Sequence, residues 1–288
     1  MSDPRPIGVF DSGVGGLTVL REIIRRSPHE STIYLGDNAR APYGVRTDAE
    51  VLAFSTESLD ALVERDVKAL VVACNTSTAV GIAAFRRRYD LPVLGVIRPG
   101  ASAAALATRN RRVGVIATPA TIRSHAYFNA IKDENPAVEV YEHATPDLVP
   151  MVESGELSGP GAEATVAASL AALLGERDAD GESIFPRPPG ATIDTLLLGC
   201  THYPLLRPII EGIVGERVAI VDSATATASA LAELLSVNGL EAATDRPATA
   251  NHRQLTTGDP GRFGALAGRL FGTDFPDVGA VELGVLAG

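Results

Sequence analysis

Two short apolar runs, each ending in a cysteine, constrain the fold of this 288-residue chain more than any other feature. The first run covers residues 69–73 and ends at Cys74, and the second covers residues 195–199 and ends at Cys200. A continuous apolar run of this length is typical of a strand buried on both faces in a parallel sheet. Small hydroxyl or amide residues follow each cysteine, so we expect each cysteine where a strand ends and a helix begins. Open α/β sheets bind ligands at such strand ends.

The composition limits the classes of protein to which the chain can belong. Hydrophobic residues make up 45% of the chain, as in a globular protein. A formal net charge of −10 argues against nucleic-acid partners and against binding to an anionic membrane surface. No apolar run approaches the roughly 20 residues of a membrane-spanning helix, and we expect no signal peptide. Two cysteines are too few for a disulfide scaffold, so we expect a cytoplasmic protein.

Strand and helix signals alternate along the first hundred residues. A glycine-rich turn at residues 11–16 permits the close approach of a ligand, although it serves equally as a plain strand-to-helix connection. Thr47, with Glu50 three residues later, is the expected start of a capped helix. Residues 98–100, Arg-Pro-Gly, are the expected hinge. The predicted strands cover residues 7–10, 32–36, 69–73 and 93–97, with helices over residues 17–24, 47–65 and 75–88.

The pattern of strand and turn then starts again, which indicates a weak internal repeat. Thr118 follows a predicted strand as Asp11 follows the first one, and each half reaches a cysteine later. The second half is longer by about the length of residues 176–190, a stretch rich in Gly, Pro and Asp that we interpret as a surface insertion. The predicted elements of this half are strands at residues 112–117, 138–141 and 195–199 and helices at residues 148–153 and 162–174.

These patterns predict an α/β protein of two similar, doubly wound domains, whose open and mostly parallel sheets face each other across a cleft. We place the domain of Cys74 at residues 1–98 and 212–288, and the domain of Cys200 at residues 99–211. The last elements are expected to rejoin the first domain: a strand at residues 218–221, a helix at 223–237, an edge strand at 252–257 and a helix at 262–271.

The two cysteines are compatible with several kinds of chemistry. Each can be a buried small hydrophobe, and a disulfide is unusual in a cytosolic chain. A zinc site of Cys74, Cys200 and His202 lacks compact spacing and an evident fourth ligand. A helix N-terminus lowers the pKa of a thiol, which also suits a cysteine hydrolase. Two matched thiols on opposing halves instead suit removal of a proton from one face of a carbon and its return to the other. A two-lobed binding module that closes on an amino acid is the non-catalytic alternative.

Six short motifs carry a resemblance to a known family. They are residues 10–17 (FDSGVGGL), 34–37 (YLGD), 42–44 (PYG), 73–76 (ACNT), 199–204 (GCTHYP) and 257–260 (TGDP). In this order they closely resemble the aspartate/glutamate racemase family, nearly from end to end. The resemblance implies a racemase that interconverts L- and D-glutamate without a cofactor or a metal and supplies D-glutamate for peptidoglycan. We expect glutamate as the partner molecule, no nucleic acid or membrane partner, and a homodimer.

The resemblance also assigns roles to individual residues. It makes Cys74 the acid/base residue for D-glutamate and Cys200 that for L-glutamate, with Asp11 assisting the former and His202 the latter. From the residues alone, Asp11 can equally be a helix cap and His202 a surface or capping residue. These motifs contain hardly any Lys or Arg, so backbone N–H groups and polar side chains are expected to hold the substrate. The implied binding residues are Asp11, Ser12, Tyr43, Gly44, Asn75, Thr76, Thr118, Thr121, Glu153, Cys200 and Thr201.

Overall fold

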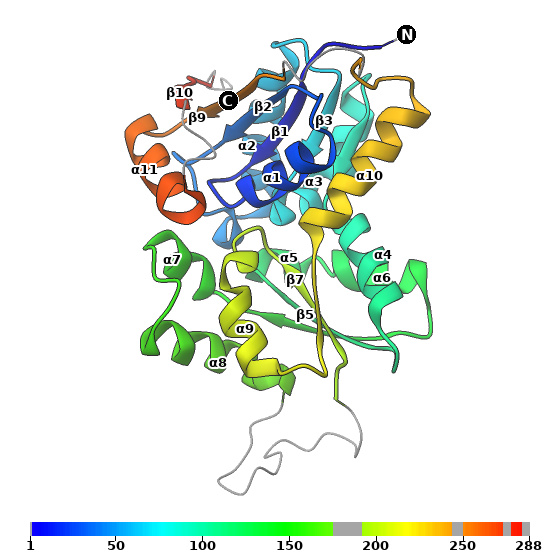
Figure 1. The fold of residues 1–288 in the computed structure, drawn as a ribbon, viewed down its shortest axis with the longest axis vertical. Helices are drawn as coiled ribbons and strands as arrows, with labels where there is room; N and C mark the ends of the chain where they lie inside the picture. Colours follow the sequence, from blue (N-terminus) through cyan, green and yellow to red (C-terminus); the bar gives the residue numbers. More distant parts are fainter. Residues whose placement is uncertain (1, 175–191, 244–249, 273–277, 284–288) are drawn as a thin grey trace, which may run out of the picture.

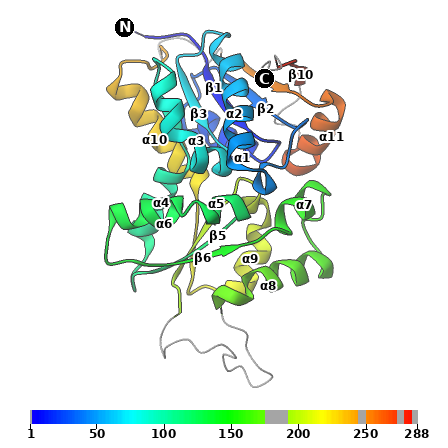
Figure 2. The same cartoon turned by 180° about the vertical axis from the view of Figure 1, so that it is seen from behind.

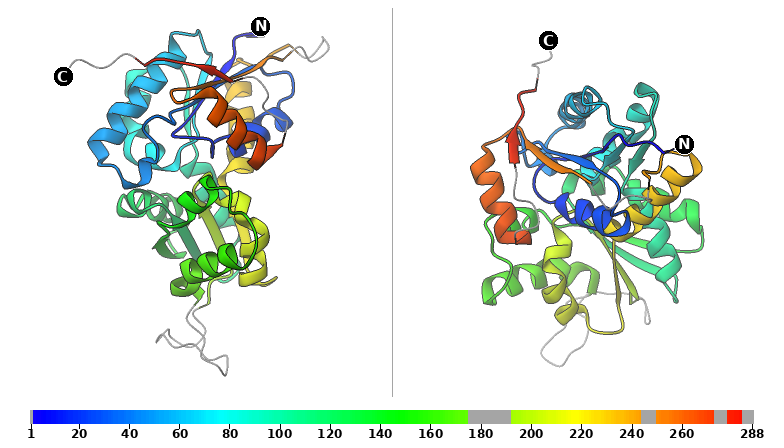
Figure 3. Two further views of the ribbon diagram at one scale, coloured as in Figure 1. Left: turned by 90° about the vertical axis from the view of Figure 1, so that its left-hand side faces the viewer. Right: turned by 45° about the horizontal axis from the view of Figure 1, so that its top comes forward.

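The computed structural model describes residues 2–174, 192–243, 250–272 and 278–283, which form two α/β units stacked one above the other (Figures 1 and 2). The predicted insertion at residues 176–190 lies outside the described residues. Within the described ranges, no helix is both long enough and apolar enough to cross a membrane. Each unit has its own parallel sheet, and the side view in Figure 3 shows the units meeting end to end.

The first unit is built on a six-stranded sheet of order β10-β9-β2-β1-β3-β4, in which every pairing is parallel. Alternate side chains of β1 enter opposite cores: Ile7 and Val9 pack with α1 and α10, and Phe10 packs with α2 and α3. Helices therefore cover both faces, as a buried parallel sheet requires. The strands are β1 (Ile7–Asp11), β2 (Thr32–Gly36), β3 (Ala69–Val72), β4 (Val93–Gly95), β9 (His252–Thr256) and β10 (Val278–Ala280). The helices are α1 (Leu17–Arg26), α2 (Asp48–Val63), α3 (Asn75–Arg88), α10 (Ser223–Val237) and α11 (Pro260–Phe271), with the 3₁₀ turn η1 (Tyr43–Val45) before α2.

The second unit has a four-stranded sheet of order β6-β5-β7-β8, again entirely parallel. Val113 and Val115 pack with α4 and α6 on one face, and Ile116 packs in the core of α8 and α9 on the other. The strands are β5 (Arg112–Ala117), β6 (Glu139–Ala144), β7 (Thr195–Gly199) and β8 (Ala219–Asp222). The helices are α4 (Ile97–Ala107), α5 (Pro119–Arg123), α6 (Ala126–Glu134), α7 (Leu148–Glu153), α8 (Pro160–Leu174) and α9 (Arg207–Val214), with the 3₁₀ turn η2 (Tyr203–Leu206) before α9.

The strand order confirms two similar, mostly parallel α/β regions. The order β2-β1-β3-β4 of the first sheet recurs as β6-β5-β7-β8 in the second. In each sheet the strand order reverses beside the first strand, between β1 and β3 and between β5 and β7. A ligand crevice is expected at the carboxyl ends of such strand pairs. These ends carry Asp11 and Cys74 in the first unit and Thr118 and Cys200 in the second.

Three local predictions differ from the structure. The strand expected to rejoin the first domain is β8, which instead pairs with β7 through Leu196 and Ile220. It completes the β7-α9-β8 part of the repeat, and the chain returns to the first unit only with α10. The expected hinge at residues 98–100 forms the first turn of α4. Pro99 is tolerated there because the N–H groups of a first turn have no partner in the helix, and an N–H is all that proline lacks. The predicted edge strand, β9, lies between β2 and the three-residue β10, which is too short to show a pattern.

Candidate active site

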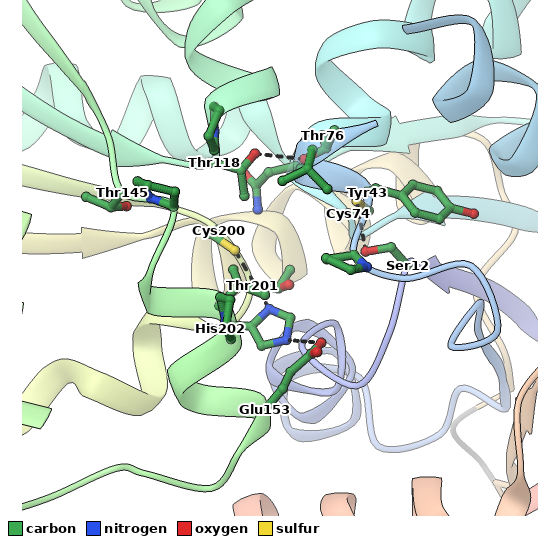
Figure 4. Close-up of a pocket in the computed structure, with 18 residues that line it drawn as sticks. Ser12, Tyr43, Cys74, Thr76, Thr118, Thr145, Glu153, Cys200, Thr201 and His202 are labelled. Carbon is green, nitrogen blue, oxygen red and sulfur yellow. Dashed lines mark hydrogen bonds and ion pairs between the residues drawn. The ribbon is translucent and has the colours of Figure 1, made fainter. Parts of the chain in front are cut away.

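A pocket lies between the two units, at the strand ends that carry the cysteines (Figure 4). All but two of the residues predicted for the site line it, and the exceptions, Asp11 and Thr121, are buried and bonded to residues that do. The predicted residues that line it are Ser12, Tyr43, Gly44, Cys74, Asn75, Thr76, Thr118, Glu153, Cys200, Thr201 and His202. The fold thus brings every predicted site residue to one place.

Cys74 approaches the pocket from the first unit as the N-cap of α3. Its Sγ accepts the Ser77 backbone N–H at 3.4 Å, and its thiol donates to Ser12 Oγ at 3.5 Å. Burial raises the pKa of Cys74 to about 11, with the nearby charge of Asp11 acting in the same direction and the two hydrogen bonds opposing it. The prediction of a lowered pKa for a thiol at this helix start is therefore wrong, because desolvation outweighs the hydrogen bonds to Ser77 and Ser12.

Asp11 lies at the end of β1 and is buried. Its Oδ2 accepts the Gly13 N–H at 3.0 Å, and its Oδ1 accepts from Thr201 Oγ1 of the second unit at 3.5 Å. The N-cap of α1 is Gly16, so Asp11 is not the cap of that helix. Burial raises the pKa of Asp11, while the charge of His202 acts in the opposite direction. Asp11 is thus a buried acid close to the thiol of Cys74 and coupled to the opposite half of the site.

Cys200, His202 and Glu153 form a chain of contacts on the second side of the pocket (Figure 4). His202 Nδ1 lies 3.7 Å from Cys200 Sγ, and Nε2 lies 3.2 Å from Glu153 Oε1. Burial lowers the pKa of His202, but its bonds to Cys200 and Glu153 outweigh this and raise it to about 10. The ring is buried and makes no capping bond, so the surface and capping alternatives for His202 are wrong. A protonated imidazole ring therefore lies beside Cys200 Sγ at neutral pH.

Three threonine hydroxyls join the units at another wall of the pocket. Thr76 Oγ1 lies 3.0 Å from Thr118 Oγ1 and 3.3 Å from Thr121 Oγ1, and the last two lie 3.1 Å apart. Thr76 belongs to α3 of the first unit, and the other two belong to the second. A hydroxyl both donates and accepts, so this cluster can turn a donor toward an anionic ligand.

Asn75 and Tyr43 also line the pocket, and they differ in how their polar groups are bonded. Asn75 Oδ1 accepts the Tyr127 hydroxyl at 2.6 Å, while its buried Nδ2 has no hydrogen-bond partner among the described residues. The hydroxyl of Tyr43 is bonded to Asp37 and points away from the pocket (Figure 4). Tyr43 therefore offers the pocket its ring and backbone, and Asn75 has a donor without a partner among the described residues.

No Lys or Arg of the described chain lines the pocket. Its charged or titratable lining residues are Glu153, His202, Tyr43 and the two cysteines. Both cysteines are free, and among the described residues no three His, Cys, Asp or Glu side chains are grouped to hold a metal ion. The disulfide and the zinc alternatives therefore have no support within this part of the chain.

The glycines of the first turn and of η1 allow the two units to approach each other. A Cβ on Gly15 would lie 2.5 Å from His202 Nδ1 and from Thr201 Oγ1, and a Cβ on Gly44 would lie 2.7 Å from Thr118 Cβ. The close approach expected at the glycine-rich turn is thus made by the other half of the protein.

Several pocket residues were not predicted. Thr145 follows β6 directly, and its hydroxyl lies 2.6 Å from that of Tyr203. Val149 and Pro150 of α7 add an apolar wall. The rule that ligands bind at the carboxyl ends of parallel strands would have indicated Thr145, because β6 neighbours β5 in the sheet. No pattern in the sequence indicated Val149 or Pro150.

Comparison with known proteins gives consistent results. The model of the family described as Asp/Glu/Hydantoin racemase matches residues 7–181. The chain is 46% identical to a glutamate racemase of Listeria monocytogenes, over 91% of this chain and 92% of that protein. A glutamate racemase structure from Bacillus anthracis matches with a TM-score of 0.85 and 40% identity, covering 97% of this chain and 98% of that one. A Francisella tularensis glutamate racemase in complex with D-glutamate matches with a TM-score of 0.83 and 33% identity, covering 97% and 98%.

Proposed function

Because this chain belongs to the Asp/Glu/hydantoin racemase family, we propose that it interconverts L-glutamate and D-glutamate by a two-thiol mechanism without a cofactor. One observation carries the proposal: two buried thiols, at equivalent positions of the internal repeat, line one pocket from opposite units. The names of the relatives and the D-glutamate complex of one of them support glutamate as the substrate.

The two thiols have surroundings that suit opposite roles when L-glutamate binds. Cys200, beside the imidazolium of His202, removes the Cα proton as a thiolate. The electron pair left on Cα is delocalised into the α-carboxylate. Cys74, held in its thiol form by burial, then delivers its own proton to the opposite face of Cα. The products are D-glutamate, a thiol at Cys200 and a thiolate at Cys74.

The reverse direction begins with Cys74 as the base. With a pKa of about 11, ionising this thiol at pH 7 costs roughly 5–6 kcal/mol, from four units at about 1.4 kcal/mol each. The α-ammonium group of the substrate reduces this cost by its positive charge, and the neighbouring Asp11 can accept the proton. Asp11 therefore serves Cys74 as His202 serves Cys200.

The substrate's two carboxylates must be held without a lysine or an arginine. The start of α3 offers backbone N–H groups beside Cys74, and Asn75 offers its unpartnered Nδ2. The hydroxyls of Thr76, Thr118 and Thr201 add donors from both units. Fixed dipoles of this kind stabilise the charge that develops on the α-carboxylate as the carbanion forms.

The use of the product rests on the resemblance. We propose that the D-glutamate enters peptidoglycan synthesis. The homodimer, the cytoplasmic location and the domain boundary at residue 98 stay predictions, and the predicted boundary at residue 211 differs from the pairing of β8 with β7.

The test is to incubate the protein with L-glutamate in deuterium oxide and to follow the optical rotation and the Cα proton signal. Loss of rotation together with loss of the Cα proton supports the proposal, and both should persist after EDTA and hydroxylamine treatment. A binding module would bind glutamate without turnover. A cysteine hydrolase would give a covalent adduct in mass spectrometry, which a thiol that only moves protons does not form.

A further inference from the structure

Tyr127 lies against residues next to both cysteines, although it does not line the pocket. It is the second residue of α6 in the second unit, and its side chain is fully buried. Its hydroxyl crosses to the first unit and donates to Asn75 Oδ1 at 2.6 Å. Asn75 directly follows Cys74.

The ring of Tyr127 packs where the chain passes between the units. A Cβ on Gly199 would lie 2.9 Å from Tyr127 Cε2, and Gly199 directly precedes Cys200. A Cβ on Gly100, in the first turn of α4, would lie 3.5 Å from Tyr127 Cε1. One side chain therefore contacts the neighbours of both thiols and one of the two crossings between the sheets.

The hydrogen bond from Tyr127 distinguishes the two ends of the Asn75 amide. An amide has one oxygen acceptor and one NH₂ donor group. The oxygen is bonded to Tyr127, and Nδ2 is buried without a partner among the described residues. Burial raises the pKa of Tyr127, while a hydrogen bond with the Ser223 side chain acts in the opposite direction; the hydroxyl therefore keeps its hydrogen at neutral pH and can donate it to Asn75. The amide is thus held by its oxygen, and its donor has no partner among the described residues, in a residue that lines the pocket.

We propose that Tyr127 is a positioning residue that fixes the Asn75 amide with Nδ2 toward a carboxylate of the substrate. This inference deepens the proposed function and rests on it. Without the Tyr127 hydroxyl, the amide can turn and present its oxygen to the carboxylate. The attraction between Nδ2 and the carboxylate is then lost, and the amide oxygen repels the carboxylate.

The first test replaces Tyr127 by phenylalanine, which keeps the ring and removes only the hydroxyl. KM for both enantiomers should rise about 10- to 100-fold, the equivalent of one hydrogen bond to a charged group. Tyr89→Phe is the matched control, because the Tyr89 hydroxyl is bonded to Asp60 and to Thr56, away from the pocket. Its KM should equal that of the wild type, and the melting temperatures of both variants are recorded.

A double-mutant cycle separates positioning from general packing. In an Asn75→Ala background, Tyr127→Phe should change KM by less than 2-fold, taking ~2-fold as the usual limit of additivity for independent sites. A further loss as large as that in the wild-type background would overturn the inference, and so would a Tyr127→Phe enzyme with the wild-type KM.

Asn75→Asp tests the orientation of the amide and leaves Tyr127 unchanged. The orientation can therefore still be tested if Tyr127→Phe does not fold. The aspartate keeps an acceptor for Tyr127 but replaces the donor by a charged oxygen. Its KM should exceed that of Asn75→Ala, whereas a KM as low as the wild type would mean that the amide oxygen faces the substrate. Wild-type protein that does not racemise glutamate refutes the proposed function itself, before any variant is compared.

Discussion

Replacing Gly15 by alanine should disable the site through one methyl group placed between the units. The new Cβ would lie 2.5 Å from His202 Nδ1 and from Thr201 Oγ1, where ordinary contacts begin at 3.4 Å. Gly15 has no positive φ, so alanine brings no backbone strain and only this clash. The overlap of roughly 1 Å is relieved by separating the units or by turning the His202 ring away from Cys200.

The size of the effect follows from that overlap. Overpacking of this kind costs about 1–3 kcal/mol, which lowers the melting temperature of a chain of this size by roughly 2–12 °C. A displacement of about 1 Å in a catalytic group costs about 10²-fold in rate. Gly15→Ala should therefore lose about 10²-fold in kcat while remaining folded.

The assay compares Gly15→Ala with Gly268→Ala by racemisation kinetics and thermal unfolding. Gly268 lies inside α11, and a Cβ there would meet nothing within 4 Å. The control should keep full activity and gain up to about 1 kcal/mol in stability, as alanine does in a helix interior. A Gly15→Ala enzyme with wild-type kcat and melting temperature would refute the tight contact between the glycine-rich turn and His202.

Two further predictions concern the helper residues. Asp11→Asn and His202→Asn should each lower kcat by roughly 10²-fold or more with little change in KM, and near wild-type turnover in both would leave them only structural roles. The pKa of His202 is about 10 in the folded protein against about 6.5 when unfolded, so its contribution to stability is complete below about pH 6.5 and lost as the pH rises through about 10. In urea unfolding across this range the wild type should lose up to about 5 kcal/mol more than His202→Asn, and parallel losses would contradict the raised pKa.

Much of the fold could be predicted because its strands are buried runs bounded by turn residues. The apolar runs before Cys74 and Cys200 became β3 and β7, and the capping box of Thr47 and Glu50 starts α2. The unit to which β8 belongs could not be predicted, since a strand's neighbours depend on the path of the crossover and not on its own residues. The three residues of β10 are too few to show an alternation.

The site was predictable where it depends on strand ends and not where it depends on how the two units meet. The positions of Cys74 and Cys200 could be predicted because both cysteines lie at strand ends. The contact of Gly15 with His202 joins segments far apart in the chain, and Tyr127 has the pattern of an ordinary core aromatic. The pKa of Cys74 was predicted in the wrong direction, because the depth of burial is set by both units together.

The most direct test of the two-thiol mechanism is deuterium exchange at Cα by the single variants Cys74→Ala and Cys200→Ala in deuterium oxide. Neither variant should racemise glutamate, because each lacks an acid on one face of Cα. Cys74→Ala should exchange the Cα proton of L-glutamate slowly, with retention of configuration, and leave D-glutamate unchanged. Cys200→Ala should exchange only D-glutamate. If either variant exchanges both enantiomers at equal rates, one base serves both faces and the two-thiol mechanism is contradicted.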